Sequence, residues 1–536
     1  VESGLFAAGL ITYEAAPAMD KAFCTHASGA LPLVWFGLYA GSQSLKDLPP
    51  PAGECRVDEW RSVVSRDCYN AAIDRIRRYI AAGDTYQVNY TIRLKSNLQG
   101  SPYALFHALA TAQQASHCAF INTDTHCICS ASPELFFRLE GERIIARPMK
   151  GTAPRGLTAG QDAENAKALQ ESEKNRAENI MIVDMVRNDL GRIAGTGSVN
   201  VAGKFDVERY PTLWQMTSTV EARTQASFAE IIKALFPCAS ITGAPKVRTM
   251  EIIRELEPEP RGIYTGAIGC LAPGRRADFN VAIRTVVVDK RTGAAEYGVG
   301  GGVIWDSVGA LEYEECLTKA MVLTTRDPEF DLLETMLWTS EEGYFLRDKH
   351  LARIQRSAEY FGFRLSVAEM ENRLTALVAT FGATDQRIRL LLANSGAIRL
   401  EAKPLVKTTD QAPFRVALAR QAVDTKDRFL YHKTTNRRVY EGARATRPEC
   451  DDVILFNEYG EVTESTIANL VVEIAGKRLT PPVKCGLLAG VFREHLLENG
   501  QVEEGLVTVA DLKRASRIFL VNSVRRWVPA VLVDAG

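Results

Sequence analysis

The chain has 536 residues, of which 46% are hydrophobic and 24% charged, an ordinary composition for a globular protein. Its 64 Lys and Arg residues nearly balance 65 Asp and Glu residues, which argues against a nucleic-acid partner and leaves room for small anionic substrates. No apolar stretch reaches the roughly 18 residues that a membrane span requires. The 11 cysteines are odd in number and scattered, which indicates free thiols in a reducing cytoplasm.

Helical and strand patterns alternate in the first part of the chain. A hairpin is predicted over residues 131–147, turning near Gly141. Residues 175–190 have the pattern of a helix that is apolar on most sides and therefore buried. Strands are predicted at residues 285–289 and 298–305, and a helix follows at residues 312–321.

A domain boundary is predicted near Pro328, because proline disfavours the continuation of the preceding helix. We therefore expect two domains, at residues 1–325 and 326–536, each long enough to build its own core. The second part again mixes a predicted helix with predicted strands, at residues 349–361, 387–393 and 469–474. Both domains are expected to be of mixed α and β structure, an α+β class overall.

Glu134 lies near the start of the predicted hairpin, and Lys150 follows just after its end. A ribbon that turns near Gly141 brings both residues to the same end, although the turn register decides whether they share a face. On chemistry alone, an exposed salt bridge is the expected fate of such a pair.

Several ordered motifs change this interpretation. They are Ala82–Gln87, Ser132–Glu134, Pro148–Thr152, Arg176–Asn179, Arg187–Leu190, Ile241–Lys246, Tyr264–Ala267, Gly300–Val303 and Glu312–Glu315. With these motifs the chain resembles the chorismate-utilising enzymes, the family of anthranilate, aminodeoxychorismate, isochorismate and salicylate synthases, over about residues 55–325. The resemblance implies a fold of β-sheets flanked by helices.

The resemblance also implies the chemistry of the first domain. Anthranilate synthases have Ala at the position of Lys150, whereas aminodeoxychorismate synthases have Lys, which is thought to add to the chorismate ring and expel the 4-hydroxyl group. The lysine must be neutral to do so. Glu134 is implied as the general acid. Gln87 stands where water-adding relatives tend to have a Lys base, so amination is favoured over hydration.

Glu312, Glu315 and Lys319 recur at i, i+3 and i+7, which predicts one face of a helix. A solvated charged face is the default interpretation, but the resemblance implies Glu178 and Glu315 as Mg²⁺ ligands, with Glu312 as a further one. Mg²⁺ prefers such carboxylates together with substrate oxygens.

Further residues are implied to bind the carboxylates and ring of chorismate. They are Gln87, Thr265, Gly266, Arg284, Gly301, Gly302 and Lys319. Glycines allow close approach of backbone amides to a substrate. Many relatives have His where this chain has Gln215, and the role of that residue is left open.

A second lysine, Lys433, lies in the motif Tyr431–Arg437. Together with Arg353 and Glu464 it resembles the fold-type IV pyridoxal-phosphate enzymes, over roughly residues 330–533, which implies an α/β domain. Lys433 is then implied to hold the cofactor as an imine and to transfer protons.

The other cofactor contacts follow from the same resemblance. Glu464 is implied to pair with the pyridine nitrogen, and Arg353 to bind the phosphate together with the backbone amides of Val491 and Phe492. These residues do not distinguish an aminodeoxychorismate lyase from a transaminase. The motifs around Lys433 and Asn522 favour the lyase.

The two resemblances together predict synthesis of 4-aminobenzoate, with Mg²⁺ and pyridoxal 5′-phosphate as cofactors and chorismate and ammonia as substrates. No G-x-C-x-G motif surrounds Cys270, so a separate glutamine amidotransferase is expected to supply ammonia. The oligomer that we consider is a homodimer formed through the second domain. The alternatives are an anthranilate-type synthase fused to a branched-chain or D-amino-acid transaminase-like domain, and a first half that only binds chorismate.

Overall fold

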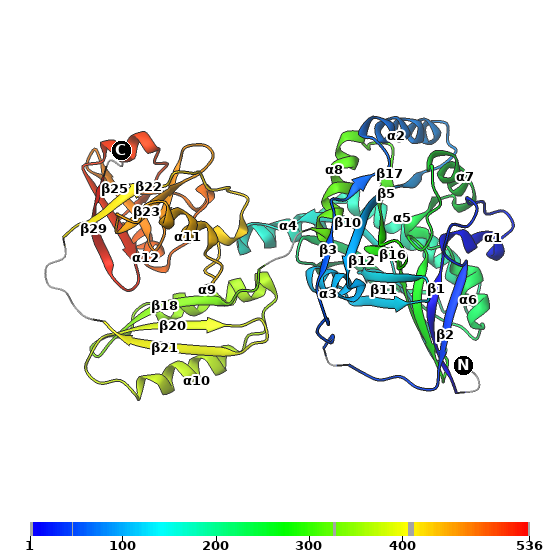
Figure 1. The fold of residues 1–536 in the computed structure, drawn as a ribbon, viewed down its shortest axis with the longest axis horizontal. Coiled ribbons are helices and arrows are strands. Elements are labelled where there is room, and N and C mark those ends of the chain that lie inside the picture. Colours follow the sequence, from blue (N-terminus) through cyan, green and yellow to red (C-terminus); the bar gives the residue numbers. More distant parts are fainter. Residues whose placement is uncertain (1–3, 46, 325–327, 406–411, 534–536) are drawn as a thin grey trace. The chain divides into compact units, whose positions relative to one another are not determined.

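The structure is a computed structural model that describes residues 4–45, 47–324, 328–405 and 412–533. The chain forms two compact units, coloured from blue to green and from yellow to red in Figure 1. The first unit comprises Val1–Arg155 and Asn165–Asp327, and the second comprises Gly156–Glu164 and Pro328–Gly536. The short segment Gly156–Glu164 thus lies in the second unit, although sequence analysis assigns it to the first domain. The limits 1–325 and 326–536 stay a prediction.

Two large antiparallel sheets form the first unit. One has the strand order β10-β12-β9-β8-β15-β14-β1-β2, with β11 paired to β12. Its strands are β1 (Phe6–Ile11), β2 (Val34–Tyr39), β8 (Leu135–Glu140), β9 (Arg143–Arg147), β10 (Met149–Pro154), β11 (Asn200–Arg209), β12 (Leu213–Arg223), β14 (Ala267–Ala272) and β15 (Arg276–Val281).

The other sheet has the order β13-β5-β17-β16-β7-β6, with β3 and β4 paired to β5. Its strands are β3 (Cys55–Val57), β4 (Arg61–Ser62), β5 (Gln87–Gly100), β6 (His117–Asn122), β7 (His126–Ser132), β13 (Gly243–Ala244), β16 (Thr285–Asp289) and β17 (Ala294–Val303).

Helices cover both sheets. They are α1 (Ala16–Met19), α2 (Arg66–Ala81), α3 (Pro102–Gln113), α5 (Glu173–Gly191), α6 (Phe228–Leu235), α7 (Lys246–Leu256) and α8 (Gly309–Ala320), with 3₁₀ turns η1 (Tyr13–Ala15), η2 (Ala239–Ile241) and η3 (Met321–Leu323). Helix α4 (Ala159–Glu171) begins in the segment of the second unit and ends in the first unit. Helices α2, α3 and α8 pack on the sheet that contains β5, and α5 and α6 pack on the sheet that contains β8. Each sheet therefore buries one face in a core of its own.

The predicted elements of this unit are mostly confirmed. The strand at residues 285–289 is β16, and the helix predicted at residues 312–321 is α8, which begins three residues earlier. Leu135 pairs with Arg147 in the hairpin of β8 and β9, whereas residues 131 and 132 belong to β7 of the other sheet. The helix α5 is buried on one face only, since Ile180 is 49% exposed, so the prediction of burial on most sides is wrong.

The second unit combines a small and a large sheet. The small sheet has the order β19-β18-β20-β21, and the large mixed sheet has the order β24-β23-β22-β29-β28-β25-β26-β27. The strands are β18 (Leu332–Thr339), β19 (Gly343–Tyr344), β20 (Gln386–Leu392), β21 (Ile398–Pro404), β22 (Phe414–Leu418), β23 (Asp452–Phe456), β24 (Val462–Ser465), β25 (Asn469–Ile474), β26 (Lys477–Thr480), β27 (Glu503–Glu504), β28 (Arg517–Asn522) and β29 (Arg526–Leu532).

The helices of this unit are α9 (Arg347–Phe361), α10 (Val367–Val378), α11 (Arg438–Ala445), α12 (Val491–Glu498) and α13 (Val509–Arg514), with the 3₁₀ turns η4 (Arg428–Leu430) and η5 (Val483–Cys485). Helices α9 and α10 pack on the small sheet, and α12 packs on β28. The helix predicted at residues 349–361 and the strands at 387–393 and 469–474 are confirmed as α9, β20 and β25.

The segment Gly156–Glu164 is held within the second unit by specific contacts. The Tyr360 hydroxyl donates a hydrogen bond to the Gly156 carbonyl at 2.8 Å, and the Leu157 side chain packs against the apolar cluster of Tyr431 and Tyr440. The second unit therefore includes residues that lie only a few positions after Lys150 in the chain.

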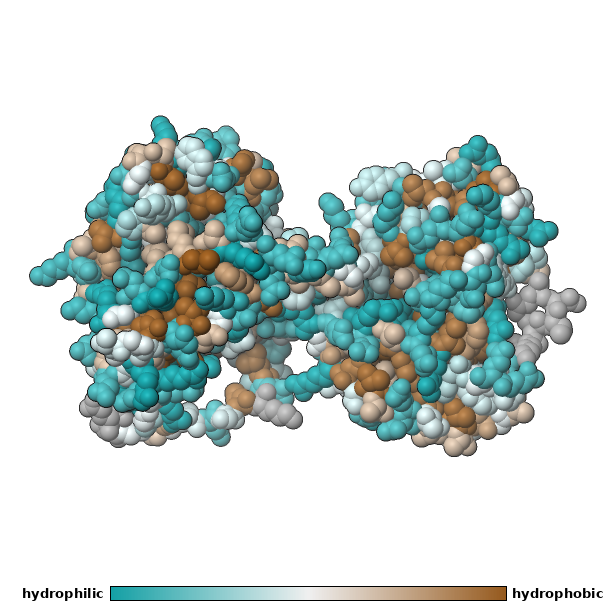
Figure 2. Space-filling model, turned by 180° about the vertical axis from the view of Figure 1, so that it is seen from behind, coloured by the Kyte–Doolittle hydropathy of each residue, from teal (hydrophilic) through white to brown (hydrophobic). Residues whose placement is uncertain are grey.

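Exposed hydrophobic residues occur in small groups among hydrophilic ones on the face shown in Figure 2. In the described ranges, no helix is both long enough and apolar enough to cross a membrane. All 11 cysteines are free, as the scattered spacing predicts, and Cys270 lies on β14 as an ordinary strand residue.

Candidate active sites

The first candidate site is built around Lys150, the second residue of β10. A Cβ atom placed on Gly302 of β17 would lie 2.8 Å from Lys150 Nζ and 1.9 Å from Gln87 Nε2, so glycine alone leaves room for both side chains. Gln87 is 1% exposed, and neither atom of its amide has a hydrogen-bond partner among the described residues. A buried amide without partners is costly, which indicates that a polar ligand completes this site.

The surroundings of Lys150 favour its neutral amine. Burial is the largest cause that lowers the pKa of Lys150 from its usual value; Glu178 on α5 opposes this shift, and Lys319 adds to it. Glu134 and Glu315 also act on this amine through their charges. Residues from both sheets and from α5 and α8 therefore converge on one lysine.

Glu134 lies between β7 and β8 and is 3% exposed. Burial raises its pKa to about 7, although the Ser240 hydroxyl, which donates a hydrogen bond to Glu134 Oε1 at 2.6 Å, opposes the shift, as does Lys150. The pairing of Leu135 with Arg147 confirms that Glu134 and Lys150 lie at the same end of the hairpin. A carboxyl group with this pKa can donate a proton near neutral pH.

The predicted face of α8 is confirmed. Lys319 Nζ forms an ion pair with Glu315 Oε1 at 2.6 Å and donates a hydrogen bond to the Gly300 carbonyl at 2.9 Å. A Cβ atom on Gly301 would lie 3.5 Å from both Glu312 Oε2 and Lys319 Nζ, so the helix presents these charges to the glycines of β17. Lys319 lowers the pKa of Glu315, whereas burial raises the pKa of Glu312.

These carboxylates fit a magnesium ion that is completed by substrate. In the described ranges, no three His, Cys, Asp or Glu side chains are placed to hold a metal ion by themselves. Mg²⁺ usually binds one or two protein carboxylates, and substrate oxygens and waters complete its coordination. A complete set of protein ligands is therefore not required. The assignment of Glu178, Glu312 and Glu315 as ligands stays a prediction.

Arg284 lies just before β16 with a φ of 52°, in the left-handed region. Its guanidinium donates a hydrogen bond to the Lys319 carbonyl, which also accepts one from the Tyr297 hydroxyl at 3.4 Å. Arg284 is thus close to the C-terminal end of α8 and already has a backbone partner. Its role toward a substrate carboxylate stays a prediction.

Gln215, whose role the sequence left open, supports the lysine strand. Its Nε2 donates a hydrogen bond to the Gly151 carbonyl at 2.8 Å, and its Oε1 accepts one from the Thr152 hydroxyl at 3.3 Å. Gln215 therefore holds the backbone that follows Lys150.

Thr265 and Gly266 have structural contacts. The Thr265 hydroxyl donates to the Tyr264 carbonyl at 2.6 Å and accepts from the buried Arg261 at 3.4 Å. A Cβ atom on Gly266 would lie 2.2 Å from the Ile11 carbonyl oxygen, so the glycine allows a close backbone approach. Their assignment to substrate binding stays a prediction.

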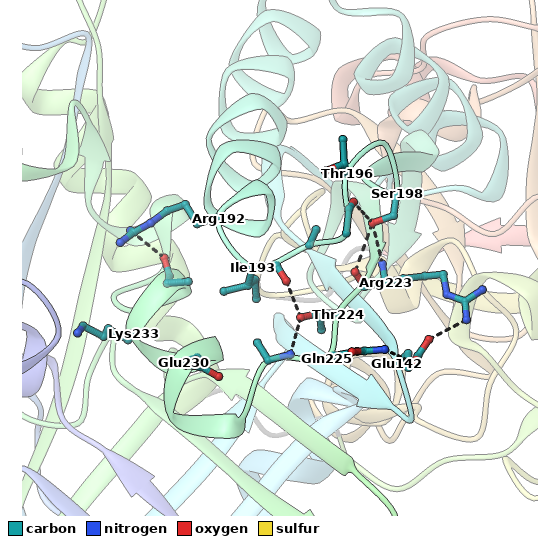
Figure 3. Close-up of a pocket in the computed structure, with 14 residues that line it drawn as sticks. Glu142, Arg192, Ile193, Thr196, Ser198, Arg223, Thr224, Gln225, Glu230 and Lys233 are labelled. Atoms are coloured by element: carbon teal, nitrogen blue, oxygen red, sulfur yellow. Dashed lines mark hydrogen bonds and ion pairs between the residues drawn. The ribbon is translucent and has the colours of Figure 1, made fainter.

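An open hollow of about 860 Å³ lies elsewhere in the first unit, at the ends of α5 and β12 (Figure 3). Its polar groups largely bond to one another: Arg223 pairs with Glu142 at 2.7 Å, and the Thr224 hydroxyl donates to the Ile193 carbonyl at 2.7 Å. These paired groups contrast with the unpartnered amide of Gln87, so we assign the chemistry to the Lys150 site.

The second candidate site is a cavity of about 400 Å³ in the second unit, within the size range of cofactor sites. Its lining includes every residue that sequence analysis assigned to the second cofactor: Arg353, Lys433, Glu464, Val491 and Phe492. Burial lowers the pKa of Lys433 to about 8, and the charge of Arg353 contributes. A substantial fraction of this amine is therefore neutral at physiological pH.

Glu464 is 4% exposed and held by three donors. The Tyr440 hydroxyl and the Leu488 amide donate to its Oε1 at 2.8 and 3.1 Å, and the Asn469 amide donates to its Oε2 at 3.1 Å. Burial nevertheless raises its pKa to about 7. This carboxyl group can accept or share a proton from a ring nitrogen.

Other residues of the cavity lining suit a phosphate group. Arg353 lies on α9, and helix α12 begins at Val491 after Gly490. A Cβ atom on Gly490 would lie 1.8 Å from Asn469 Oδ1, so glycine is needed for the backbone to enter the cavity here. The first amides of a helix have no partners within the helix and bind anions well.

Sequence analysis missed several residues that hold these groups, namely Ser240, Glu334, His350, Tyr440 and Asn469. Glu334 on β18 accepts hydrogen bonds from Arg353 at 2.8 and 2.6 Å and from His350 at 2.7 Å. The sequence could have pointed to Ser240, directly before the motif Ile241–Lys246, and to His350, which lies three residues before Arg353. The partners of Glu334 and Glu464 are set by the fold.

Comparison with known proteins places the chain in a family. Residues 2–325 match the family of chorismate binding enzymes. The chain belongs to this family. Residues 331–533 match the family of class IV amino-transferases, so domains of two enzyme families follow each other in one chain. The predicted α+β architecture and both resemblances are thereby confirmed.

Individual relatives of the chorismate-binding part differ in name. Over 262 residues the chain is 43% identical to aminodeoxychorismate synthase component 1 of Klebsiella aerogenes, covering 48% of this chain and 58% of that protein. Over 261 residues it is 39% identical to anthranilate synthase component 1 of Thermus thermophilus, covering 48% of this chain and 56% of that one. The matches thus span little more than half the length of these relatives.

A solved structure supports the same fold. Anthranilate synthase component I of Streptococcus pneumoniae superposes with a TM-score of 0.53 at 26% identity, covering 60% of this chain and 81% of that one. The similar identities to two kinds of synthase mean that particular residues must distinguish their reactions.

Proposed function

We propose that the chain makes 4-aminobenzoate from chorismate in two steps, amination to 4-amino-4-deoxychorismate and then elimination of pyruvate. The observation that carries the proposal is the buried position of the Lys150 amine. It shares with the Gln87 amide the space that the missing side chain of Gly302 leaves open. A second lysine cavity follows in the same chain. Each step therefore has its own set of residues.

The first step uses Lys150 and Glu134. The neutral amine of Lys150 forms a bond to the chorismate ring while the C4–O bond breaks, and Glu134 gives its proton to the leaving oxygen, which departs as water. Ammonia then displaces Lys150 and leaves the 4-amino group on the ring. Gln87 can donate and accept hydrogen bonds but cannot act as a base for water, which favours amination.

Magnesium, when bound, would neutralise a chorismate carboxylate so that an amine can approach an anion. Glu178 and Glu315 would hold it, with Glu312 as a further ligand. Arg284, Lys319 and the amides of Gly301 and Gly302 would bind the remaining carboxylate, and Thr265 and Gly266 would shape the ring pocket. Lys319 would have to release Glu315, its present ion-pair partner at 2.6 Å.

We expect the Glu315→Gln variant to need at least about tenfold more Mg²⁺ for half-maximal amination, because an uncharged amide is a poor ligand for a hard cation. Glu178→Gln should behave in the same way. The measurement is the amination rate against Mg²⁺ concentration. Glu314→Gln is the matched control, since Glu314 pairs with the exposed Arg66 at 3.0 Å on another face of α8. Full activity of the unmodified protein in excess EDTA would refute the assignment.

The pKa of Glu134, about 7, predicts the pH dependence of the first step. A general acid must be protonated, so kcat/KM should fall as pH rises through this value. The Ser240 hydrogen bond lowers this pKa, so Ser240→Ala should move the falling limb up by about one pH unit, because hydrogen bonds to charged groups contribute about 1.5 kcal/mol or more. The rates are compared at a constant concentration of un-ionised ammonia.

Ser198→Ala controls for the loss of a serine hydroxyl elsewhere in this unit, because Ser198 bonds to the Gly195 carbonyl at 2.7 Å, away from Glu134. The fall of kcat/KM with rising pH should occur at the same pH in this control as in the parent protein. Coincident limbs for Ser240→Ala and the parent would show that Glu134 is not the acid.

The second step requires pyridoxal 5′-phosphate, and the second cavity fits this cofactor. Its lining includes the buried carboxyl group of Glu464, the start of α12 and the buried His350 Nε2, which lacks a partner in the described part of the chain. It also includes the basic residues Arg353, Arg387, Arg389, Lys433, Arg437 and Arg525. When bound, the cofactor would supply an electron sink conjugated with the substrate amino group.

The residues of this chain would hold and serve the cofactor. Arg353 and the amides of Val491 and Phe492 would bind its phosphate, and Glu464 would share a proton with its ring nitrogen. Tyr440 and Asn469 orient Glu464. Lys433 would bind the cofactor aldehyde covalently and then move the proton from the substrate α-carbon.

The proposal includes the source of ammonia, the cellular compartment and the assembly of the protein. Relatives named component 1 support a separate glutamine amidotransferase as the source of ammonia, with free ammonium as its substitute in the test tube. Free thiols throughout support a reducing cytoplasm as the compartment. A homodimer through the second domain stays an expectation.

The test is a product assay. Purified protein is supplied with chorismate, ammonium, Mg²⁺ and pyridoxal phosphate, and the products are separated by chromatography. We expect 4-aminobenzoate and pyruvate in equal amounts. Anthranilate would instead support the less favoured alternative, an anthranilate-type synthase fused to a branched-chain or D-amino-acid transaminase-like domain. Lack of any chorismate turnover would favour a first domain that only binds chorismate.

A further inference from the structure

His350 is a buried titratable group of the second cavity to which the proposed function gives no role. It is 1% exposed and lies on α9, three residues before Arg353, so the two side chains share a helix face. Both residues line the cavity together with Lys433. The ring has one bonded and one unbonded nitrogen: Nδ1 lies 2.7 Å from Glu334 Oε2, whereas Nε2 is buried and has no partner among the residues described.

The bonded nitrogen determines the state of the ring. The charge of Arg353 and the hydrogen bonds from Arg353 and His350 hold the pKa of Glu334 at about 2, even though burial opposes the shift, so this carboxylate is ionised and accepts the hydrogen bond. Nδ1 must then carry a proton. In the neutral ring Nε2 is therefore a bare acceptor that faces a cavity edged with cations.

The charges around His350 keep its ring neutral in the absence of an anion. Burial lowers its pKa, Glu334 on β18 opposes the shift, and Arg353 on α9 and Lys433 contribute to it. Glu334 also forms two hydrogen bonds to Arg353, at 2.8 and 2.6 Å, and thus offsets the positive charge of the arginine that shares a helix face with His350. A phosphate dianion beside Nε2 would favour the protonated ring, and Arg387, Arg389, Arg437 and Arg525, which also line the cavity, would share its negative charge.

We propose that His350 takes up a proton when a phosphate-bearing ligand fills the second cavity, and that its Nε2–H then donates a hydrogen bond to the phosphate. The proton comes from solvent and adds to the lone pair of Nε2, so no other bond changes. This makes His350 a positioning residue that matches the charge of the site to its ligand. The inference rests on the proposed function only in taking the occupant to be a phosphate-bearing cofactor.

The sign of the linkage follows from this proposal. A bound phosphate raises the pKa of His350 above its value in the free protein, so binding takes up protons between the two pKa values. Affinity for the phosphate-bearing ligand is then highest at lower pH and falls as pH rises through the pKa of the bound state. Ligands without phosphate should not have this dependence.

The test uses pyridoxamine 5′-phosphate, which lacks the aldehyde and cannot bond covalently to Lys433, and pyridoxamine, which lacks the phosphate. Both are titrated calorimetrically into the full-length protein freed of cofactor, at about pH 7.5, where a phosphate monoester is mostly a dianion. Proton uptake is obtained from heats in two buffers of different ionisation enthalpy. The phosphate-bearing probe should take up close to one proton more than pyridoxamine, as linkage to one histidine requires.

His350→Gln should lose this difference and bind the phosphate-bearing probe about tenfold more weakly, as expected for loss of a hydrogen bond between charged groups. His107→Gln, in the first unit, is the control and should keep the parent values. Equal proton uptake in His350→Gln and the parent protein would overturn the proposal.

A second measurement does not depend on the folding of a variant. The chain has 7 histidines, so ¹⁵N-histidine labelling of the parent protein gives a spectrum of few signals. One ring should change from the neutral form with bare Nε2 to the doubly protonated form with pyridoxamine phosphate and not with pyridoxamine. A ring that stays neutral would refute the inference while leaving the proposed function intact. Failure of both pyridoxal phosphate and pyridoxamine phosphate to bind would refute both.

Discussion

Replacement of Lys150 by alanine should lower the formation of aminodeoxychorismate by about a thousandfold or more, because the variant has no amine to form the bond to the ring. The alanine should be tolerated structurally, because it removes atoms from the space beside Gly302 and adds none. Elimination of pyruvate from supplied aminodeoxychorismate should continue at the parent rate. Both steps are followed by chromatography of the products.

Lys95→Ala is a suitable control for this experiment. Lys95 lies on β5, the strand that begins with Gln87, but it is 46% exposed in its side chain and pairs with Glu259 at 2.7 Å. Amination should be unchanged in this variant. Unchanged amination by Lys150→Ala would exclude Lys150 as the nucleophile, and a change of product to anthranilate would show that Lys150 directs where ammonia enters.

Replacement of Lys433 by alanine should stop the release of pyruvate and 4-aminobenzoate, again by about a thousandfold or more, since both the covalent attachment and the base for the α-proton are lost. The parent protein should have a visible absorbance from the cofactor bound to Lys433, and borohydride should fix the cofactor to this residue. Both signals should be absent from the variant. In the parent protein the pKa of Lys433 is about 8, so part of the amine is neutral near physiological pH and can attach the cofactor.

The first step should continue in the Lys433→Ala protein, so aminodeoxychorismate should accumulate without pyruvate. Lys484→Ala is the matched control, because Lys484 is an exposed lysine of the same unit, on the turn η5, and it should keep both the absorbance and the product. If Lys433→Ala still forms 4-aminobenzoate at the parent rate, the second unit is not the lyase and the transaminase alternative returns.

The two lysines lie in different surroundings. Burial lowers the pKa of both, but Lys150 has carboxylates and a second lysine as neighbours, whereas Lys433 lies near an arginine that is already paired with Glu334. In each site burial thus lowers the pKa of an amine, and the neighbouring charges adjust it further.

Local patterns in the sequence predicted elements whose interactions are mainly local. The strands at residues 285–289 and 469–474 were predicted from runs of β-branched and apolar residues. The shared face of Glu312, Glu315 and Lys319 follows from helical periodicity, and the hairpin of β8 and β9 brings Glu134 and Lys150 to one end because its turn is short. These relations need no distant partner.

Tertiary structure alone decided what surrounds the reactive groups. Ser240 reaches Glu134 across 106 positions of the sequence, Glu334 meets Arg353 across 19, and Gly302 meets Lys150 through the packing of strands from two sheets. Segment Gly156–Glu164 belongs to the second unit although it follows the lysine strand of the first. Sequence motifs name the reactive residues, but burial sets their pKa values and their hydrogen-bond partners, and burial depends on long-range packing that no local pattern contains.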